Sequence, residues 1–335
     1  GPLTTNNMIS GGDGAYCFYD KNEAEILITS TYYNRYYLFI NNEYINYFNG
    51  NNGIFINPAD YNSINNTLYA NAVKFNGNLQ NRIYIIRNIN SNPQESTINL
   101  FTGTSVPYSM IKYSETIAEN DIIYLGTQSG YLFKASINSN DNYNVNNITD
   151  DLFPTANISS LSEGMTSDTL LVTFSNYGIS SVFTSVDGGI NWINKDSNLP
   201  DMPIRSSILH SNSSNNCLIA TEIGVWETNN LFSDNPAWYP HNNFPNVRVD
   251  MLSIREDDNM ILASTHGRGQ FYGYYNINNI LIGDLNDDDL INILDVIYLV
   301  NIILSDQECD NCDINNDNSI NVLDIIKLVN IILKI

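Results

Sequence analysis

The feature that most constrains the fold of this chain is a duplication near its C-terminus. The stretch from Asp284 to Leu304 aligns with the stretch from Asp313 to Leu333, 29 residues later, with 14 identities in 21 positions. Each copy begins with closely spaced acidic and amide residues and ends in an apolar run. The sequence therefore predicts a loop followed by a helix, built twice.

The oxygen-bearing residues of each copy fall at positions 1, 3, 5, 9 and 12 of a twelve-residue loop, and position 7 contributes a main-chain carbonyl. This is the ligand spacing of an EF-hand calcium site. The predicted ligands of the first loop are Asp284, Asn286, Asp288, Leu290, Asn292 and Asp295. Those of the second loop are Asp313, Asn315, Asp317, Ser319, Asn321 and Asp324. An acidic solvated turn would not repeat five ligand positions twice, so we predict two bound calcium ions.

Position 6 of such loops usually carries glycine, because the turn there is sharp. Here it is Asp289 in the first loop and Asn318 in the second. Asp and Asn are the non-glycine residues that best tolerate a left-handed backbone conformation. We therefore expect some added strain, without loss of the loop.

Helices are predicted over Ile293–Leu304 and Val322–Ile335, directly after the loops. Polar residues form only a narrow stripe on the second helix, so apolar residues cover most of its circumference. Two short helices cannot hide that much apolar surface on each other, and we expect a docking face. Its predicted residues occupy loop positions 10 and 11 and are Ile293, Leu294, Val322 and Leu323.

A pair of calcium loop-helix repeats at a C-terminus resembles the dockerin domain, a module that attaches secreted proteins to cohesin-bearing scaffolds. The resemblance covers about 53 residues. Positions 10 and 11 of dockerins often carry a Ser-Thr pair, whereas this chain has apolar residues there. The resemblance implies calcium-dependent docking to a cohesin-like partner, and the apolar helices leave two other partners open, the chain's own N-terminal domain and a second copy.

Before about residue 276 the sequence has a different character. Short segments rich in β-branched and aromatic residues alternate with turns of Asn, Gly and Asp, as in "AEILITSTYY" at 24–33 and "NRIYIIRNI" at 81–89. This pattern predicts all-β structure. We expect one domain over residues 1–275 and a second, small all-α domain over residues 276–335.

The β segments recur in a common frame. "IYLGT, turn, GYLFKAS" at 123–136 reappears as "LIATEIGVWET" at 218–228 and "ILASTHGRGQF" at 261–271. Intervals of about 40 to 50 residues between four-strand units are typical of β-propeller blades. About six units fit between residues 11 and 275, and we expect six to eight blades, leaving open that the ring is incomplete in this chain.

One unit contains "SVDGGINW", in which Ser185, Asp187, Gly189 and Trp192 fit the pattern S-x-D-x-G-x-x-W. It resembles the Asp-box, or BNR, repeat of sialidases, sortilin-type receptors and many secreted propellers. The resemblance implies a structural role in the hairpin between the third and fourth strands of a blade. There the Asp would accept turn N–H bonds, the Gly would supply a positive φ and the Trp would pack between blades.

The amino-acid composition disfavours some classes of binding partner. The net charge of −22 disfavours nucleic acids and anionic membranes. No run of eighteen apolar residues predicts a membrane helix, and no signal-peptide pattern is present. The resemblances imply an extracellular or cell-surface location. Cys309 and Cys312 form a CxxC pair without a second pair of zinc ligands nearby, which favours a local disulfide or free thiols over zinc.

Catalytic residues are not assigned. Arg205 in "MPIRS" fits an ordinary strand start, and the most suggestive polar residues are Asp13 in "GGDG" and His266 and Arg268 in "HGRG". A histidine without a partner base or nucleophile is weak support for catalysis, so structural roles in tight turns are favoured. The leading hypothesis is a binding and assembly protein with a glycan as a candidate ligand. The alternative is a glycoside hydrolase of the xyloglucanase or sialidase-like propeller type.

Overall fold

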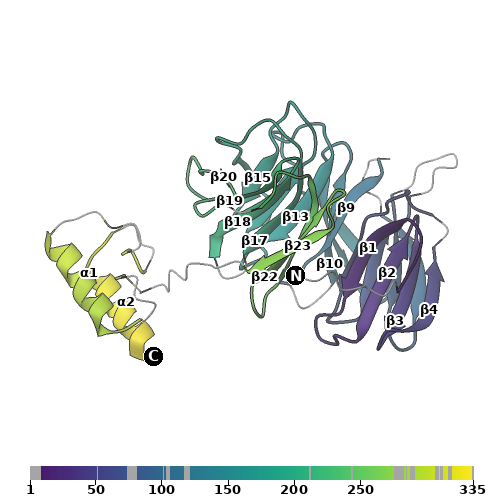
Figure 1. Ribbon diagram of the computed structural model, residues 1–335, viewed down its shortest axis with the longest axis horizontal. Coiled ribbons are helices and arrows are strands. Elements are labelled where there is room, and N and C mark those ends of the chain that lie inside the picture. Colours follow the sequence, from purple (N-terminus) through teal and green to yellow (C-terminus); the bar gives the residue numbers. More distant parts are fainter. Residues whose placement is uncertain are drawn as a thin grey trace. The chain divides into compact units, whose positions relative to one another are not determined.

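The structure is a computed structural model. It describes residues 9–50, 52–73, 81–100, 102, 106–116, 121–210, 213–242, 244–274, 283, 285–286, 291–305, 309, 312–315 and 319–333. The chain divides into two compact units, one of Gly1–Glu256 with Ile261–Gly273 and one of Asp257–Met260 with Tyr274–Ile335. The first unit is built of strands and the second of two helices (Figure 1).

Six antiparallel sheets make up the first unit, and strands that follow one another in the chain are neighbours in each sheet. The first sheet contains β1 (Gly14–Tyr19), β2 (Ile26–Thr31), β3 (Arg35–Ile40) and β4 (Glu43–Asn49). The second contains β5 (Ala59–Asn62), β6 (Thr67–Asn71), β7 (Arg82–Arg87) and β8 (Gln94–Asn99). The third contains β9 (Tyr108–Tyr113), β10 (Asp121–Thr127), β11 (Leu132–Ile137) and β12 (Tyr143–Asn147).

The remaining sheets continue the same pattern. The fourth contains β13 (Ile158–Glu163), β14 (Leu170–Phe174), β15 (Val182–Ser185) and β16 (Ile193–Asn194). The fifth contains β17 (Ile204–His210), β18 (Ser213–Thr221), β19 (Gly224–Thr228) and β20 (Tyr239–Pro240). The sixth contains β21 (Val249–Arg255), β22 (Met260–Thr265) and β23 (Gln270–Tyr274), three strands within the described part of the chain.

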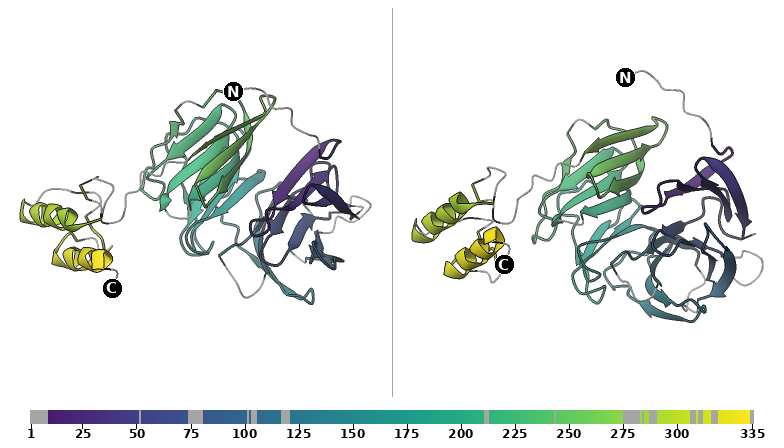
Figure 2. Two further views of the ribbon diagram at one scale, coloured as in Figure 1. Left: turned by 60° about the horizontal axis from the view of Figure 1, so that its bottom comes forward. Right: turned by 90° about the horizontal axis from the view of Figure 1, so that it is seen from below.

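The first strand of each sheet contacts the first strand of the next, in the order β1, β5, β9, β13, β17 and β21. The sheets are therefore the blades of a β-propeller, arranged in chain order (Figures 1 and 2). The prediction of a propeller is confirmed. The described part of the chain forms six blades, the lower end of the expected six to eight.

Period-two alternation along the strands fills the spaces between blades. On β6 and β7, Leu68, Ala70 and Tyr84 join the apolar cluster shared with the first blade. Tyr69 and Ile83, on the opposite faces of the same strands, join the cluster shared with the third blade. Each inner blade is thus apolar on both faces, which explains why its strands have nearly continuous apolar sequences.

Serine hydroxyl groups connect the innermost strands of three consecutive blades. Ser109 Oγ donates a hydrogen bond to the carbonyl of Ile158 at 2.7 Å, and Ser159 Oγ donates to the carbonyl of Ile204 at 2.6 Å. Farther round, Ser206 Oγ accepts from the N–H of Leu252 at 3.2 Å. Innermost strands have no strand partner on their axial side, so these hydroxyl groups satisfy main-chain groups that a sheet edge leaves unpaired.

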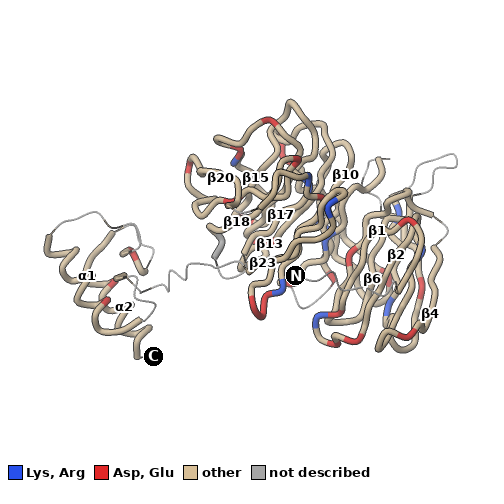
Figure 3. Tube along the Cα trace, viewed as in Figure 1, with Lys and Arg blue, Asp and Glu red and all other residues tan. Residues whose placement is uncertain are grey.

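Asparagine shapes many of the turns, as its abundance predicts. Asn41, Asn42, Asn66, Asn88 and Asn259 have positive φ values between 50° and 63°. Acidic residues also lie mainly in turns and at strand ends (Figure 3). One expected strand was too long, because the segment predicted over 24–33 is a strand only over Ile26–Thr31, and Tyr33, with φ 62°, belongs to the following turn.

The second unit contains α1 (Ile293–Ser305) and α2 (Val322–Leu333). Its core repeats the sequence duplication, since all its members except Cys309 and Cys312 come in pairs spaced 29 residues apart. These pairs are Leu285 with Ile314, Ile291 with Ile320, Val296 with Ile325, Leu299 with Leu328, Ile302 with Ile331 and Ile303 with Ile332. Among the described helices none is long and apolar enough to cross a membrane.

Candidate functional site

Eight of the twelve predicted calcium ligands lie among the described residues. In the first loop they are Asn286, Asn292 and Asp295. In the second loop they are Asp313, Asn315, Ser319, Asn321 and Asp324. Asp284, Asp288, Leu290 and Asp317 lie outside the described residues. Within the described part of the chain, no three His, Cys, Asp or Glu side chains gather as a metal-binding group.

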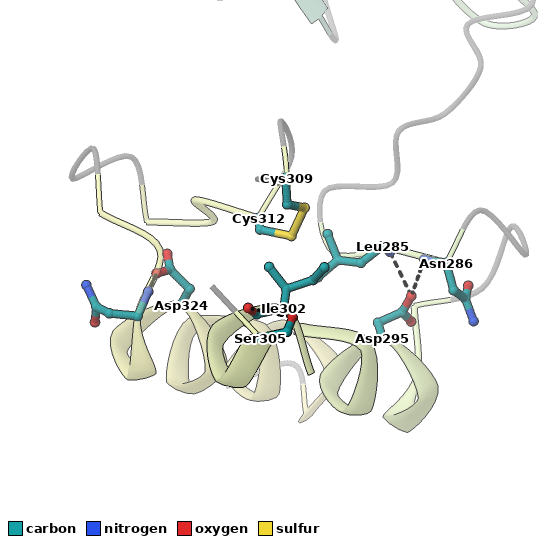
Figure 4. The surroundings of a disulfide bond; sticks show 9 residues. Leu285, Asn286, Asp295, Ile302, Ser305, Cys309, Cys312 and Asp324 are labelled. Atoms are coloured by element: carbon teal, nitrogen blue, oxygen red, sulfur yellow. Dashed lines mark hydrogen bonds between the residues drawn. A yellow bond between two sulfur atoms is a disulfide. The ribbon is translucent and has the colours of Figure 1, made fainter. Parts of the chain in front are cut away.

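Asp295, at position 12 of the first loop, is fully buried and holds the loop against the start of α1 (Figure 4). Its Oδ1 accepts from the N–H groups of Leu285 at 2.7 Å and Asn286 at 3.3 Å. Its Oδ2 accepts from the N–H of Asn292 at 2.8 Å, while Asn292 Oδ1 accepts from the N–H of Leu294 at 2.8 Å. Asn292 thus caps the helix through its side chain, and Asp295 in the first turn accepts from the Asn292 N–H, an arrangement similar to a capping box that starts the helix.

The second loop repeats this geometry around Asp324, which is also fully buried. Asp324 Oδ1 accepts from the N–H of Asn315 at 3.1 Å, and Oδ2 accepts from the N–H of Asn321 at 2.8 Å. Asn321 in turn accepts from the N–H of Leu323 at 2.8 Å. In both loops, the carboxylate at position 12 thus accepts hydrogen bonds from the main-chain N–H groups of positions 3 and 9.

These residues fit a calcium ion in their chemistry. Calcium takes six to eight oxygen ligands, and every predicted ligand is a carboxylate, amide, hydroxyl or main-chain oxygen. A fully buried carboxylate is costly unless its charge is compensated, and backbone N–H groups compensate it only in part. A bound cation would supply the missing positive charge at Asp295 and Asp324.

The predicted docking residues are exposed on the described helices. Ile293 and Val322 are 62% and 60% exposed, and Leu294 and Leu323 are both 52% exposed. One turn farther along each helix, Ile297 and Ile326 are exposed as well. In the last turn, beyond the exposed Asn301 and Asn330, Leu304 and Leu333 are also exposed. We call these eight apolar residues the docking face.

Cys309 and Cys312 form a disulfide in the segment between the repeats (Figure 4). Cys312 is fully buried in the core of the second unit and immediately precedes Asp313, the first predicted ligand of the second loop. The disulfide therefore fixes the chain where the second loop begins. The sequence left open whether Cys309 and Cys312 form a local disulfide or remain free thiols, and the structure has the disulfide.

In the first unit, Ser185, Asp187, Gly189 and Trp192 lie in the hairpin between β15 and β16, the third and fourth strands of the fourth blade. Asp187 Oδ1 accepts from Ser185 Oγ at 2.8 Å and from the N–H groups of Ile190 at 3.0 Å and Asn191 at 2.9 Å. Gly189 has φ 93° and donates its N–H to Ser185 Oγ at 2.9 Å.

Trp192 leaves this hairpin and packs between the third and fourth blades. It is buried in a cluster with residues of both blades, and its Nε1 donates to the carbonyl of Ile148 at 3.1 Å, at the end of the third blade. The ring of Phe153 lies edge-on to it, with centroids 5.1 Å apart. The hairpin thus anchors one blade to the previous one.

The Asp187 hydrogen bonds give a pH prediction. The bonds from Asn191 and Ser185 lower the pKa of Asp187 from 3.8 to about 2. Because the pKa of Asp187 is lower in the folded than in the unfolded chain, its charge stabilises the fold at pH values above the unfolded pKa of 3.8. This contribution is lost as the pH falls through about 2. Asp187→Asn should therefore cost about 1 kcal/mol at neutral pH, and the difference from the wild type should shrink between pH 4 and pH 2. Urea unfolding of both proteins across this range measures it, and a constant difference would contradict it.

A pocket of about 290 Å³ lies where the innermost strands of all blades converge. Its lining includes Tyr16 from β1, Pro58 just before β5, Ser109 from β9, Ser159 from β13, Arg205 from β17 and Asp250 from β21. Only the propeller axis brings these strands together. The lining residues lie near the beginnings of the strands, so the pocket is at one end of the axis. We call it the axial pocket.

Arg205 is the functional candidate that sequence reasoning missed, since "MPIRS" looked like an ordinary strand start. Its guanidinium pairs with Glu222 and lies 3.8 Å from Asp250 Oδ1. Asp250 also accepts from Arg248 Nε at 2.7 Å and lies 3.1 Å from His266 Nδ1. Arg205 and Glu222 belong to the fifth blade, and Arg248, Asp250 and His266 belong to the sixth, so only the folded propeller brings the two groups together.

The polar residues singled out in the sequence have different positions. His266 approaches the axial pocket through its contact with Asp250, while Asp13 and Arg268 are exposed. In comparisons with known proteins, no family model matches the chain and no curated protein matches its sequence.

Proposed function

We propose that this chain is a secreted or surface-displayed binding and assembly protein. Its C-terminal unit, with two calcium ions bound, docks on a cohesin-like scaffold protein through the docking face. The propeller is the part that is thereby attached and displayed. The observation that carries the proposal is the coincidence, in two copies, of a calcium-type loop with an exposed apolar helix surface directly after it.

The energetics of this face support docking. Apolar surface gains about 25 cal/mol per Å² when it is removed from water, so burying several hundred Å² favours association by several kcal/mol before entropic costs. Four apolar positions are exposed in both copies, where a solvated helix would carry polar groups. The Cys309–Cys312 disulfide supports an oxidising, extracellular location.

The loops explain how calcium would control docking. Each loop ends at the N-terminus of the helix that presents the face, and positions 10 and 11 follow the predicted ligand at position 9 directly. A metal that orders the loop would also fix Ile293 and Leu294, or Val322 and Leu323. Without the metal, the acidic side chains of the loop repel one another, and the face loses its support.

Replacing both Leu294 and Leu323 with glutamate tests the proposal. We expect calcium-dependent binding to immobilised cohesin domains, measured by surface plasmon resonance, to weaken at least 100-fold, because two buried apolar contacts become desolvated charges. Ile64→Glu, at a propeller position that is 70% exposed, is the matched control and should leave binding unchanged.

Sedimentation analysis of the same proteins, in calcium and in chelator, distinguishes docking on a scaffold from self-association. A calcium-dependent dimer that the double variant abolishes would reassign the face to a second copy of the chain. If neither cohesin binding nor self-association depends on calcium, the proposal is wrong.

A further inference from the structure

The axial pocket has walls of three different kinds. Tyr16, Ile54, Ile56 and Pro58 form an apolar wall from the first two blades. The third and fourth blades supply a wall of hydroxyl and amide groups, from Ser109, Gln128, Asn157, Ser159 and Ser175. Arg205 and Asp250 complete the lining from the last two blades. Because Ser109 and Ser159 already donate their hydroxyl protons to main-chain carbonyls, they offer a ligand acceptor lone pairs. A matching ligand therefore needs an apolar face and several hydroxyl-type groups that can donate to these oxygens and accept from the remaining donors.

The charges of the pocket are matched internally. Arg205 pairs with Glu222, and Asp250 pairs with Arg248. An ionic ligand would meet a group whose charge is already compensated by its partner, so it would lose its own hydration without gaining the attraction of an unpaired charge. A neutral ligand can instead accept from the guanidinium and donate to the carboxylate, which gives charge-assisted hydrogen bonds without displacing either partner.

Next to the apolar wall lies an aromatic cluster of Tyr32, Tyr33 and Phe55, which we call the aromatic ledge. Tyr33 and Phe55 are its exposed members, whereas Tyr32 is partly buried and has Arg35 Cζ 4.3 Å from its ring centroid. Phe55 follows Ile54 and precedes Ile56, both of which line the pocket. The rings of Tyr32 and Phe55 are stacked with centroids 5.9 Å apart, and Tyr33 lies edge-on to both. Tyr33 is 45% exposed and Phe55 is 51% exposed.

Tyr33 occupies a position that its side chain does not favour. It has φ 62°, in the left-handed region, where a bulky residue is strained. Among the described residues, five other left-handed positions are occupied by asparagine, which tolerates that conformation better. Tyrosine at position 33 therefore lowers stability while it exposes an aromatic ring. Such a conflict with local preference is typical of functional sites.

The ledge is held rigidly from below. The N–H of Tyr33 donates to the carbonyl of Phe55 at 3.1 Å. Beneath it, the buried amides of Asn34, Asn57 and Asn71 are linked, with Asn57 Nδ2 donating to Asn34 Oδ1 at 2.6 Å and Asn71 Nδ2 donating to Asn57 Oδ1 at 3.0 Å. Asn57 Oδ1 also accepts from the N–H of Ile54 at 3.0 Å. A binding surface fixed in this way loses little entropy when a ligand binds.

From this geometry we infer that the propeller binds a neutral oligosaccharide, with one end in the axial pocket and the following sugar units lying on the aromatic ledge. Sugar rings have flat faces of C–H groups, which suit the exposed rings of Tyr33 and Phe55 and the apolar wall. Their edges carry hydroxyl groups that both donate and accept, as the polar wall requires. This site is separate from the docking face, and the inference goes beyond the proposed function.

Titration calorimetry of the full chain in calcium tests the inference. The probes are neutral oligosaccharides of four to six units, namely cello-, xylo- and manno-oligosaccharides, with oligogalacturonate as the acidic comparison. We expect at least one neutral probe to bind and oligogalacturonate to bind at least tenfold more weakly. Tyr33→Asn and Phe55→Ala should each weaken the neutral probe about two- to tenfold.

Tyr33→Asn separates binding from folding, because asparagine suits the left-handed backbone and the variant should melt no earlier than the wild type. Tyr239→Ala, at an exposed tyrosine of β20, is the matched control and should bind normally. The inference is overturned if no neutral probe binds, if oligogalacturonate binds best, or if both ledge variants bind like the wild type. Binding of a peptide pool that competes with the sugar would also overturn the assignment to saccharides.

Discussion

Replacing both Asp295 and Asp324 with alanine should unfold the C-terminal unit even in excess calcium and leave the propeller intact. Each carboxylate is fully buried and accepts main-chain N–H bonds from its own loop. Leaving such donors unsatisfied costs about 1–3 kcal/mol each, and losing a helix cap adds about 1 kcal/mol. Because small units have little stability to spare, two such losses exceed it.

The measurement can follow the two units separately. All three tryptophans, Trp192, Trp226 and Trp238, belong to the propeller, so tryptophan fluorescence reports on the propeller alone. Circular dichroism at helical wavelengths reports mainly on α1 and α2, the helices of the described chain. We expect the helical signal to disappear in the double variant and the fluorescence transition to stay in place.

The matched control for this experiment is the double variant Asp295→Asn, Asp324→Asn. An asparagine retains one acceptor for the loop N–H groups but removes the charge, so the helices should form while calcium affinity falls at least 100-fold. Calorimetry should show about two calcium ions on the wild type. If the asparagine variant binds calcium like the wild type, the two residues serve only as helix caps, and their assignment as calcium ligands would have to be abandoned. If the wild type itself binds no calcium, the calcium proposal is wrong.

Trp192→Ala is expected to be the most damaging single change in the propeller, costing about 3–5 kcal/mol. The indole is almost fully buried between two blades, so truncation opens a cavity at their interface and removes the hydrogen bond to Ile148. Trp192→Phe is the matched control. It keeps the aromatic contact with Phe153 and loses mainly the hydrogen bond, so it should cost about 1–2 kcal/mol.

Urea unfolding followed by circular dichroism at strand wavelengths compares these variants with the wild type. The expected order of stability is wild type, then Phe, then Ala. A loss below about 1 kcal/mol for the alanine variant would show that the blades pack independently of this side chain.

Features set by local sequence were predictable. The strands were predicted from the alternation of apolar residues, and the blades from the spacing of the recurring segments. Both patterns lie within a single strand or hairpin, so they can be recognised without knowing the fold. The starts of α1 and α2 also follow from sequence, since Asn292 and Asn321 precede apolar runs as helix caps. The end of β2 was misjudged because tyrosine favours strands, and nothing local shows that Tyr33 takes a left-handed conformation.

The axial pocket could not be predicted for a different reason. Its lining comes from five innermost strands and from connecting segments beside them, which are distant in the chain and meet only on the propeller axis. Tyr16, Arg205 and Asp250 each look ordinary in their own segment. The aromatic ledge was missed because tyrosines in strand-like segments usually belong to the core, whereas Tyr33 and Phe55 lie in turns and are exposed.

The two halves of the C-terminal duplication differ at the residue just before the first predicted ligand. In the first repeat it is Gly283, with φ 109°, and a Cβ there would lie 2.6 Å from Leu328 Cδ1. In the second repeat the equivalent residue is Cys312, joined to Cys309. One loop is thus positioned by close packing and the other by a covalent bond. A thiol reductant that cleaves this disulfide should therefore loosen the second loop and leave the first unchanged. Two loops of nearly identical sequence can thus be distinguished chemically in the same molecule.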